Sequence, residues 1–311
     1  KGTREYSEEF NWDGLYKTHE EFRDALEKSG ITNVRIKGAE ADDIVFAWSS
    51  LLNSKGKNSL IISGDNDLLQ LVNHDNTNGT NTIYYHKSKQ KIFAYQGFTD
   101  WLNQDQESVD IFNQPISMID NAKDNLKKCL KAFEIEEINS EEFQFTKILV
   151  GDTGDNVASL YTIEATYKSG KKSGEKYYKR LTSTQAYKIL NSFKEYNKDL
   201  TISESIFWNP EYISQICKLA KKICKIDFID TKDLIKNYED NRNLMILNSR
   251  ALPNGIMTAM LENASKHSNK IISNDNMNIL KKFDSVLEFT SYTSESKKKQ
   301  NTSGFFGQFN I

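Results

Sequence analysis

The stretch from Leu60 to Leu71, LIISGDNDLLQL, constrains the fold of this chain more than any other segment. Its apolar start predicts a buried strand, because short apolar runs bounded by turn residues are typical of strands inside a sheet. Gly64 ends the strand, and Asp65 and Asp67 follow at its carboxyl end. Ligands of open α/β sheets bind at that edge, so two carboxylates there indicate a candidate site if the chain stays extended. An Asp turn with a helix cap at Asp67 is the alternative.

Strand and helix patterns alternate around this stretch. Residues 31–38 predict a short strand, residues 39–56 carry apolar side chains at helical spacing, and residues 81–95 have the pattern of a hairpin with a polar tip. This order favours an α/β fold with a parallel sheet flanked by crossover helices. From residue 181 onward the pattern is mostly helical, which predicts a helical C-terminal part.

Composition excludes several classes of protein. Hydrophobic residues make up 38% of the 311 residues and charged residues 27%, which is typical of a soluble globular protein. No apolar run of about 18 residues occurs, so we expect no membrane partner. Cys129, Cys217 and Cys224 lack the spacing of metal ligands and indicate a reduced, cytoplasmic protein.

Two further acidic motifs accompany the first. Glu40, Asp42 and Asp43 begin a predicted helix, where capping and the helix dipole are the simpler explanation. Asp152 and Asp155 flank Gly154, where a glycine turn is the simpler explanation. If all three motifs converged, their seven carboxylates would repel one another unless cations lay among them. Mg²⁺ suits such oxygen-only sites, and two ions stabilise attack on a phosphodiester.

Basic residues are concentrated in one segment although the net charge is only −2. The segment 168–180 carries six bases against one acid, Glu175. Glycine, serine and lysine make it too polar for a core, so it predicts a loop or hairpin. We expect it to contact nucleic acid phosphates, and a solvated loop is the alternative.

In order and approximate spacing, EADDI, SGDNDLLQL and GDTGDNVASL resemble the flap endonuclease / 5′-nuclease family, especially its phage ribonuclease H members. The resemblance implies a PIN-like sheet and a helix–three-turn–helix DNA-binding element. It also implies two Mg²⁺ or Mn²⁺ ions, the first held by Glu40, Asp42, Asp43 and Asp65, and the second by Asp67, Asp152 and Asp155. The KGTR start resembles a family segment in which Lys1 and Arg4 would act on the scissile phosphate; an ordinary basic terminus is the alternative.

The resemblance implies further partners. K⁺ and the DNA backbone would bind at the helix–three-turn–helix element, through Gly151, Gly154, Asn156, Lys168, Lys171, Lys172, Lys176, Lys179 and Arg180. Substrates would be branched or nicked duplex DNA and RNA–DNA with 5′ ends or flaps. The aromatic tail resembles peptides that bind a sliding clamp, through Phe305, Phe306, Phe309 and Ile311; a tail folded onto its own core is the alternative.

These features predict three regions: a nuclease α/β domain over 1–145, a helix–three-turn–helix and helical domain over 146–290, and a flexible tail over 291–311. The family's first strand, with its own metal-binding Asp, has no counterpart in the sequence, so we expect little activity from this chain alone. The favoured function is a replication or repair 5′-nuclease, in a bacterial or phage-infected cell. A noncatalytic DNA-structure-binding subunit or inactive fragment and a PIN-type ribonuclease are the alternatives.

Overall fold

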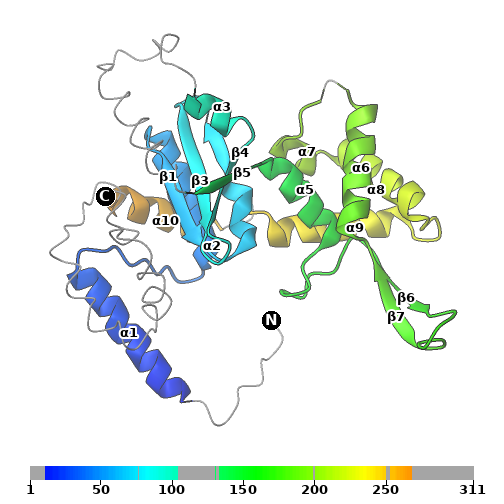
Figure 1. The fold of residues 1–311 in the computed structure, drawn as a ribbon, viewed down its shortest axis with the longest axis horizontal. Coiled ribbons are helices and arrows are strands. Elements are labelled where there is room, and N and C mark those ends of the chain that lie inside the picture. Colours follow the sequence, from blue (N-terminus) through cyan, green and yellow to red (C-terminus); the bar gives the residue numbers. More distant parts are fainter. Residues whose placement is uncertain are drawn as a thin grey trace. The chain divides into compact units, whose positions relative to one another are not determined.

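The computed structural model describes residues 11–75, 77–103, 130, 133–198, 200–249 and 253–267 (Figure 1). The chain divides into two compact units, each assembled from separate stretches. The first unit includes Asn53–Trp101 and Glu134–Pro253. The second includes, among the described residues, 11–52 and 254–267. Lys1, Arg4, Cys129 and the predicted tail lie outside the described residues.

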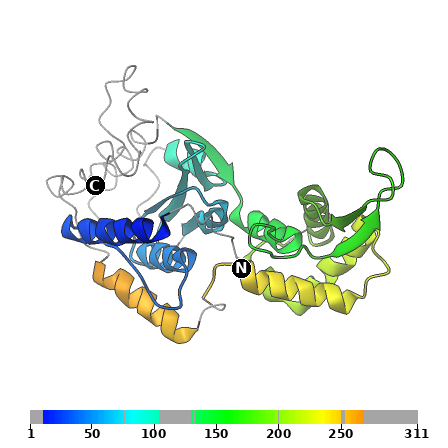
Figure 2. The ribbon, with the colours of Figure 1, turned by 90° about the horizontal axis from the view of Figure 1, so that it is seen from below.

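Helices make up the regular structure described in the second unit (Figure 2): α1 (Trp12–Lys28), α10 (Asn254–His267) and most of α2 (Ala41–Ser54). Asn11 caps α1 by accepting a hydrogen bond of 2.8 Å from the backbone N–H of Gly14. The predicted helix over 39–56 is confirmed as α2. The predicted strand over 31–38 is wrong, because these residues join α1 to α2 without any ladder. A strand pattern becomes a strand only where a partner offers backbone hydrogen bonds.

A mixed sheet forms one half of the first unit. It contains β1 (Ser59–Ser63), β2 (Asn73–Asp75), β3 (Thr80–His86), β4 (Lys91–Tyr95) and β5 (Glu134–Ile138). The strand order is β1-β3-β4-β5, with β2 paired to β3. The β1·β3 and β4·β5 pairs are parallel, whereas the predicted hairpin, confirmed as β3·β4, is antiparallel. The α/β class is confirmed, and the hairpin makes the sheet mixed rather than purely parallel.

Helices form the other half of the first unit, and all but one of them follow residue 181, where a mostly helical pattern was predicted. They are α5 (Ser140–Val150), α6 (Ser183–Tyr196), α7 (Glu204–Trp208), α8 (Pro210–Cys224) and α9 (Thr231–Met245). One apolar cluster holds them together, with Phe145, Leu149, Leu190, Phe207 and Ile216 at its centre. Polar residues start the helices, as in the capping box of Thr182 and Gln185 at α6.

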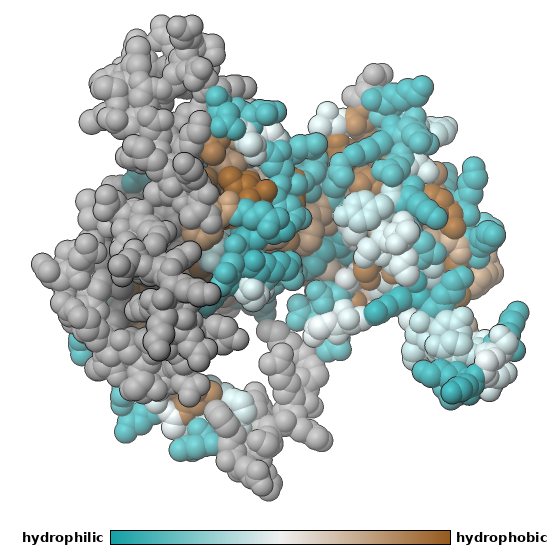
Figure 3. Space-filling view, viewed as in Figure 1, coloured by the Kyte–Doolittle hydropathy of each residue, from teal (hydrophilic) through white to brown (hydrophobic). Residues whose placement is uncertain are grey.

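Three short elements complete the first unit. The 3-10 helix η1 (Asn66–Leu71) follows β1 and packs against α5. Helix α3 (Phe98–Asn103) follows β4 and continues two residues past Trp101, where this stretch of the first unit ends. A hairpin of β6 (Thr162–Thr166) and β7 (Lys176–Arg180) separates α5 from α6. It projects beyond the helices in both ribbon views and carries mostly hydrophilic side chains (Figure 3). Within the described part of the chain, no helix combines the length and apolarity that crossing a membrane requires.

Candidate metal centre

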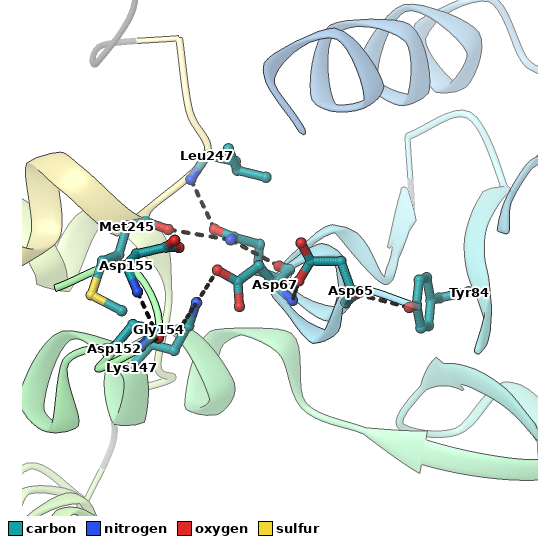
Figure 4. A network of polar contacts seen from close by, with 10 residues as sticks. Asp65, Asp67, Tyr84, Lys147, Asp152, Gly154, Asp155, Met245 and Leu247 are labelled. Carbon is teal, nitrogen blue, oxygen red and sulfur yellow. Dashed lines mark hydrogen bonds and ion pairs between the residues drawn. The ribbon is translucent and has the colours of Figure 1, made fainter. Parts of the chain in front are cut away.

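Three carboxylates from distant parts of the sequence converge in the first unit (Figure 4). Asp67 belongs to η1, whereas Asp152 and Asp155 lie in the turn after α5. One carboxylate oxygen from each residue lies within 4.8 Å of the other two. An oxygen-only set of ligands suits a hard divalent cation such as Mg²⁺ or Mn²⁺. The donor chemistry of this cluster therefore fits a divalent metal ion.

The turn at the end of β1 places Asp67. Asp65 caps η1 by accepting a hydrogen bond of 2.9 Å from the backbone N–H of Asp67. The hydroxyl of Tyr84 on β3 donates to the backbone carbonyl of Asp65 across 2.8 Å. The stretch is thus a capped turn rather than an extended segment, and the cap is Asp65 rather than Asp67. Asp65 is exposed and does not belong to the three-carboxylate cluster.

Gln70 is a buried residue of η1 that the sequence interpretation missed. Its amide nitrogen donates to the backbone carbonyls of Asp67 (2.9 Å) and Met245 (3.2 Å). Its amide oxygen accepts from the backbone N–H of Leu247 across 2.8 Å. Gln70 therefore fixes η1, and with it Asp67, to the end of α9. A polar residue among Leu68, Leu69 and Leu71 was the signal available in the sequence.

A tight turn presents Asp152 and Asp155. Gly151 ends α5 with φ 72° and ψ −170°, a conformation that is essentially restricted to glycine. Asp152 and Val157 exchange two backbone hydrogen bonds, of 3.0 and 2.7 Å. The Oδ1 atom of Asp152 accepts from the backbone N–H of Gly154 across 2.7 Å and of Asp155 across 3.4 Å. The predicted glycine turn is therefore present, and it brings both acids to one side.

Asn241 of α9 anchors this turn to α5. Its buried amide donates to the carbonyls of Ile148 (2.9 Å) and Ala158 (2.8 Å). A buried amide that satisfies two carbonyls fixes the segments that carry them. Asn241 is a second positioning residue that the sequence interpretation missed. Asn237, one helical turn earlier, donates its amide to the carbonyl of Leu160 across 3.1 Å, and no sequence motif identifies either residue.

Lys147 places a cation among the carboxylates. It lies in the last turn of α5, and its side chain is only 12% exposed. Its ammonium forms an ion pair with Oδ2 of Asp67 and lies 3.6 Å from Oδ2 of Asp152. Three carboxylates and one ammonium leave two negative charges, which one divalent cation would balance. The sequence interpretation missed Lys147, because no acidic motif includes it.

The remaining predicted metal ligands belong to the second unit. Glu40 precedes α2, and Asp42 and Asp43 lie in its first turn. Asp43, the third residue of the helix, accepts a hydrogen bond of 2.9 Å from the backbone N–H of Glu40, which is one half of a capping box. Capping, the simpler explanation for this motif, therefore describes Asp43. The convergence of Glu40, Asp42 and Asp43 with Asp65 stays a prediction.

The basic segment forms most of the β6–β7 hairpin. Lys168, Lys171 and Lys172 occupy its exposed tip, and Lys176, Lys179 and Arg180 lie on β7. Tyr178 is 70% exposed. On the opposite face of the ribbon, the rings of Tyr167 and Tyr177 lie 4.4 Å apart. Of the other predicted DNA-binding residues, Gly151, Gly154 and Asn156 lie in the turn after α5, where Asn156 has a φ of 59°.

Comparisons with known proteins give two sequence similarities, each over only part of the chain. The family model described as "5'-3' exonuclease, N-terminal resolvase-like domain" matches residues 5–103. A 5'-3' exonuclease of Buchnera aphidicola subsp. Schizaphis graminum (strain Sg) is 45% identical over 56 residues, which cover 18% of this chain and 19% of that protein. No solved structure matches the chain. Residues 5–103 are therefore similar to the N-terminal domain of 5'-3' exonucleases, and the α/β fold of the chain fits a resolvase-like domain.

Proposed function

We propose that the chain is a structure-specific 5′-nuclease, a 5′-to-3′ exonuclease and flap endonuclease that removes primers or flaps in DNA replication or repair. The observation that carries this proposal is the convergence of Asp67, Asp152 and Asp155. Asp67 lies within the segment that matches the exonuclease model, and the other two acids come from beyond it. A cluster assembled from both parts links the exonuclease-like segment to the helical region of the same unit.

Two divalent ions would account for the acidic motifs. Asp67, Asp152 and Asp155 would hold one ion, and Glu40, Asp42, Asp43 and Asp65 the other. Such a pair activates the attacking water and stabilises the leaving oxygen of a phosphodiester. In this proposal Lys1 contacts the scissile phosphate and Arg4 stabilises the charge that develops on it.

DNA would bind along the turn after α5 and the β6–β7 hairpin. The family resemblance implies K⁺ and the DNA backbone at this turn, which carries Gly151, Gly154 and Asn156. The hairpin would contact the duplex backbone through Lys168, Lys171, Lys172, Lys176, Lys179 and Arg180, each able to neutralise a phosphate. Recognition would be of structure rather than sequence.

The finer parts of the proposal follow from the resemblance. The phage ribonuclease H members of the family act on RNA–DNA as well as on DNA flaps, and we propose the same substrates here. The aromatic tail would bind a sliding clamp through Phe305, Phe306, Phe309 and Ile311. A cytoplasmic location, in a bacterial or phage-infected cell, fits these substrates.

Cleavage of a labelled 5′-flap duplex tests the proposal. The purified chain is incubated with the flap substrate, K⁺ and either Mg²⁺ or EDTA, and products are resolved by length. Because little activity is expected from this chain alone, we expect weak cutting near the flap junction, with Mg²⁺ only, and its loss in Asp67→Asn and Asp155→Asn. Binding of the flap substrate by the chain without any cutting would favour the noncatalytic DNA-binding alternative. Cutting of single-stranded RNA with no preference for a duplex junction would favour the PIN-type ribonuclease.

A further inference from the structure

Lys147 is enclosed by the acidic cluster rather than exposed to solvent. Its side chain is 12% exposed, and those of its partners Asp67 and Asp152 are 25% and 31% exposed. A partly buried ammonium loses hydration, and this loss is compensated only where carboxylates surround it. The short distances to two acids from different elements meet that requirement.

Local structure fixes the position of this lysine. The backbone carbonyl of Lys147 accepts from the N–H of Gly151 across 2.8 Å, so the residue lies in a closed last turn. Asn241 holds the next carbonyl, that of Ile148. The ammonium therefore extends toward Asp67 and Asp152 from a rigid helix end. A cation in the last turn also interacts favourably with the helix dipole.

The same charge has opposite effects on the two forms of the cluster. Without a metal ion, three neighbouring carboxylates repel one another, and the ammonium offsets part of that repulsion. With a divalent ion present, the ammonium repels the ion and competes for the Oδ2 atom of Asp67. An ordinary structural ion pair would stabilise both forms alike.

We propose that Lys147 is an internal counter-ion of the Asp67–Asp152–Asp155 cluster. It assembles the cluster before metal binds and lowers its affinity for a divalent cation, because Asp67 must exchange the ammonium for the ion. This inference rests on the proposed function, since it concerns the metal ion of that site. Lys147 is thus a positioning residue that makes the ion readily exchangeable.

Titration of the metal-free full chain with Mn²⁺ tests the proposal by calorimetry. Wild type is compared with Lys147→Met and with Lys147→Arg, which keeps the charge. Lys194→Met is the matched control, because Lys194 pairs with Glu142 near the other end of α5. The heat of Mn²⁺ binding that is lost in Asp155→Asn is assigned to this cluster. Thermal unfolding of each variant is measured in EDTA and with saturating Mn²⁺.

We expect Lys147→Met to bind Mn²⁺ roughly tenfold more tightly, because a nearby positive charge has been removed. Its unfolding temperature in EDTA should fall, and Mn²⁺ should raise it by more than in wild type. Lys147→Arg and Lys194→Met should bind Mn²⁺ with nearly wild-type affinity. Equal or weaker Mn²⁺ binding by Lys147→Met would overturn the proposal.

A measurement on wild type covers the case in which Lys147→Met does not fold. Nitrogen-15 spectra of the lysine ammonium groups, with Lys147 assigned from Lys147→Arg, are recorded during addition of Mg²⁺. We expect the Lys147 signal to shift or disappear as the cluster fills; an unchanged signal at saturation would count against the exchange. A wild-type chain that binds neither ion at the cluster would overturn the proposed metal-dependent function itself, a result distinct from failure of the lysine effect.

Discussion

The backbone N–H of Leu247 donates to the side-chain oxygen of Gln70 across 2.8 Å, although the two residues are 177 positions apart. Through this bond, the segment after α9 holds the short helix that carries Asp67. The same side chain binds the carbonyls of Asp67 and Met245. The position of a candidate metal ligand therefore depends on a neutral amide at 5% exposure.

Replacement of Gln70 by leucine should destabilise the first unit and loosen η1. Three hydrogen bonds would be lost and buried backbone groups left without partners, which costs about 2–4 kcal/mol in total. Hydrogen exchange of the η1 amides should accelerate, and the free energy of unfolding should fall in urea. Gln96→Leu, at an exposed position, is the control. Wild-type exchange rates in Gln70→Leu would contradict this role.

Gly151→Ala should distort the turn that presents Asp152 and Asp155. An added Cβ would lie 2.6 Å from the carbonyl oxygen of Val157, at a residue with a φ of +72°. Gly174→Ala is a matched control, because its φ is +90° but no atom lies within 4 Å of the added Cβ. The control should lose about 1 kcal/mol of stability from backbone strain alone, and Gly151→Ala clearly more. Equal losses in urea unfolding would show that the close approach has no energetic effect.

Tyr178→Ala should weaken binding to duplex DNA without changing stability. The ring is 70% exposed on the β6–β7 hairpin, and base or sugar packing against such a ring contributes about 1–3 kcal/mol. Tyr196→Ala is the control, because Tyr196 is 78% exposed at the end of α6, away from the basic segment. Fluorescence anisotropy with a labelled flap duplex measures the affinities. An equal loss in both variants would argue against a specific role of the hairpin.

Lys172→Ala/Lys176→Ala should weaken DNA binding for all sequences alike. Lys172 lies 6.0 Å from the ring centre of Tyr167, and Lys176 pairs with Glu164 across 2.8 Å at the surface. Both ammonium groups remain accessible to phosphates, so the double change should flatten the dependence of affinity on salt. Affinities are measured at several salt concentrations. An unchanged slope would exclude these two lysines from phosphate contacts.

Cys217 and Cys224 should be unreactive in the folded chain. Burial raises the pKa of the Cys217 thiol to about 12, and burial also raises the pKa of Cys224. Because the thiolate is the reactive form, a Cys129→Ser variant at pH 8 should react slowly with a disulfide reagent. Two thiols should become reactive after unfolding in guanidinium. Fast reaction of the folded variant would show that the α8 core opens readily.

Glu137 should contribute stability that is lost in acid. Hydrogen bonds from the Thr99 hydroxyl and the backbone N–H groups of Gly97 and Thr99 lower its pKa from the ordinary 4.5. A carboxyl group whose pKa is lower in the folded state than in the unfolded state stabilises the fold at pH values above the unfolded-state pKa. That stabilisation is lost as the pH falls through the folded-state pKa. Glu137→Gln should therefore be less stable than wild type at pH 7, with the difference shrinking below pH 4.5. If the unfolding temperatures of Glu137→Gln and wild type differed by the same amount at every pH, this role of Glu137 would be contradicted.

The sequence by itself determined the elements whose signals are local. The apolar run before Gly64 became β1, the 81–95 pattern became the β3–β4 hairpin, and the glycine turn formed around Gly154. The basic segment also became a hairpin. Each of these depends on side-chain alternation, turn residues or backbone conformations that are encoded within a few neighbouring positions.

Only the tertiary structure decided which distant groups meet. Packing of η1 against α5 brings Asp67 to Asp152 and places Lys147 between them. The buried amides of Gln70 and Asn241 bind carbonyls that no local pattern identifies. Residues 31–38 fail to form a strand for the same reason, because a ladder requires a partner from elsewhere in the chain. Contacts between remote segments arise from the packing of whole elements, so their partners are not written into either segment alone.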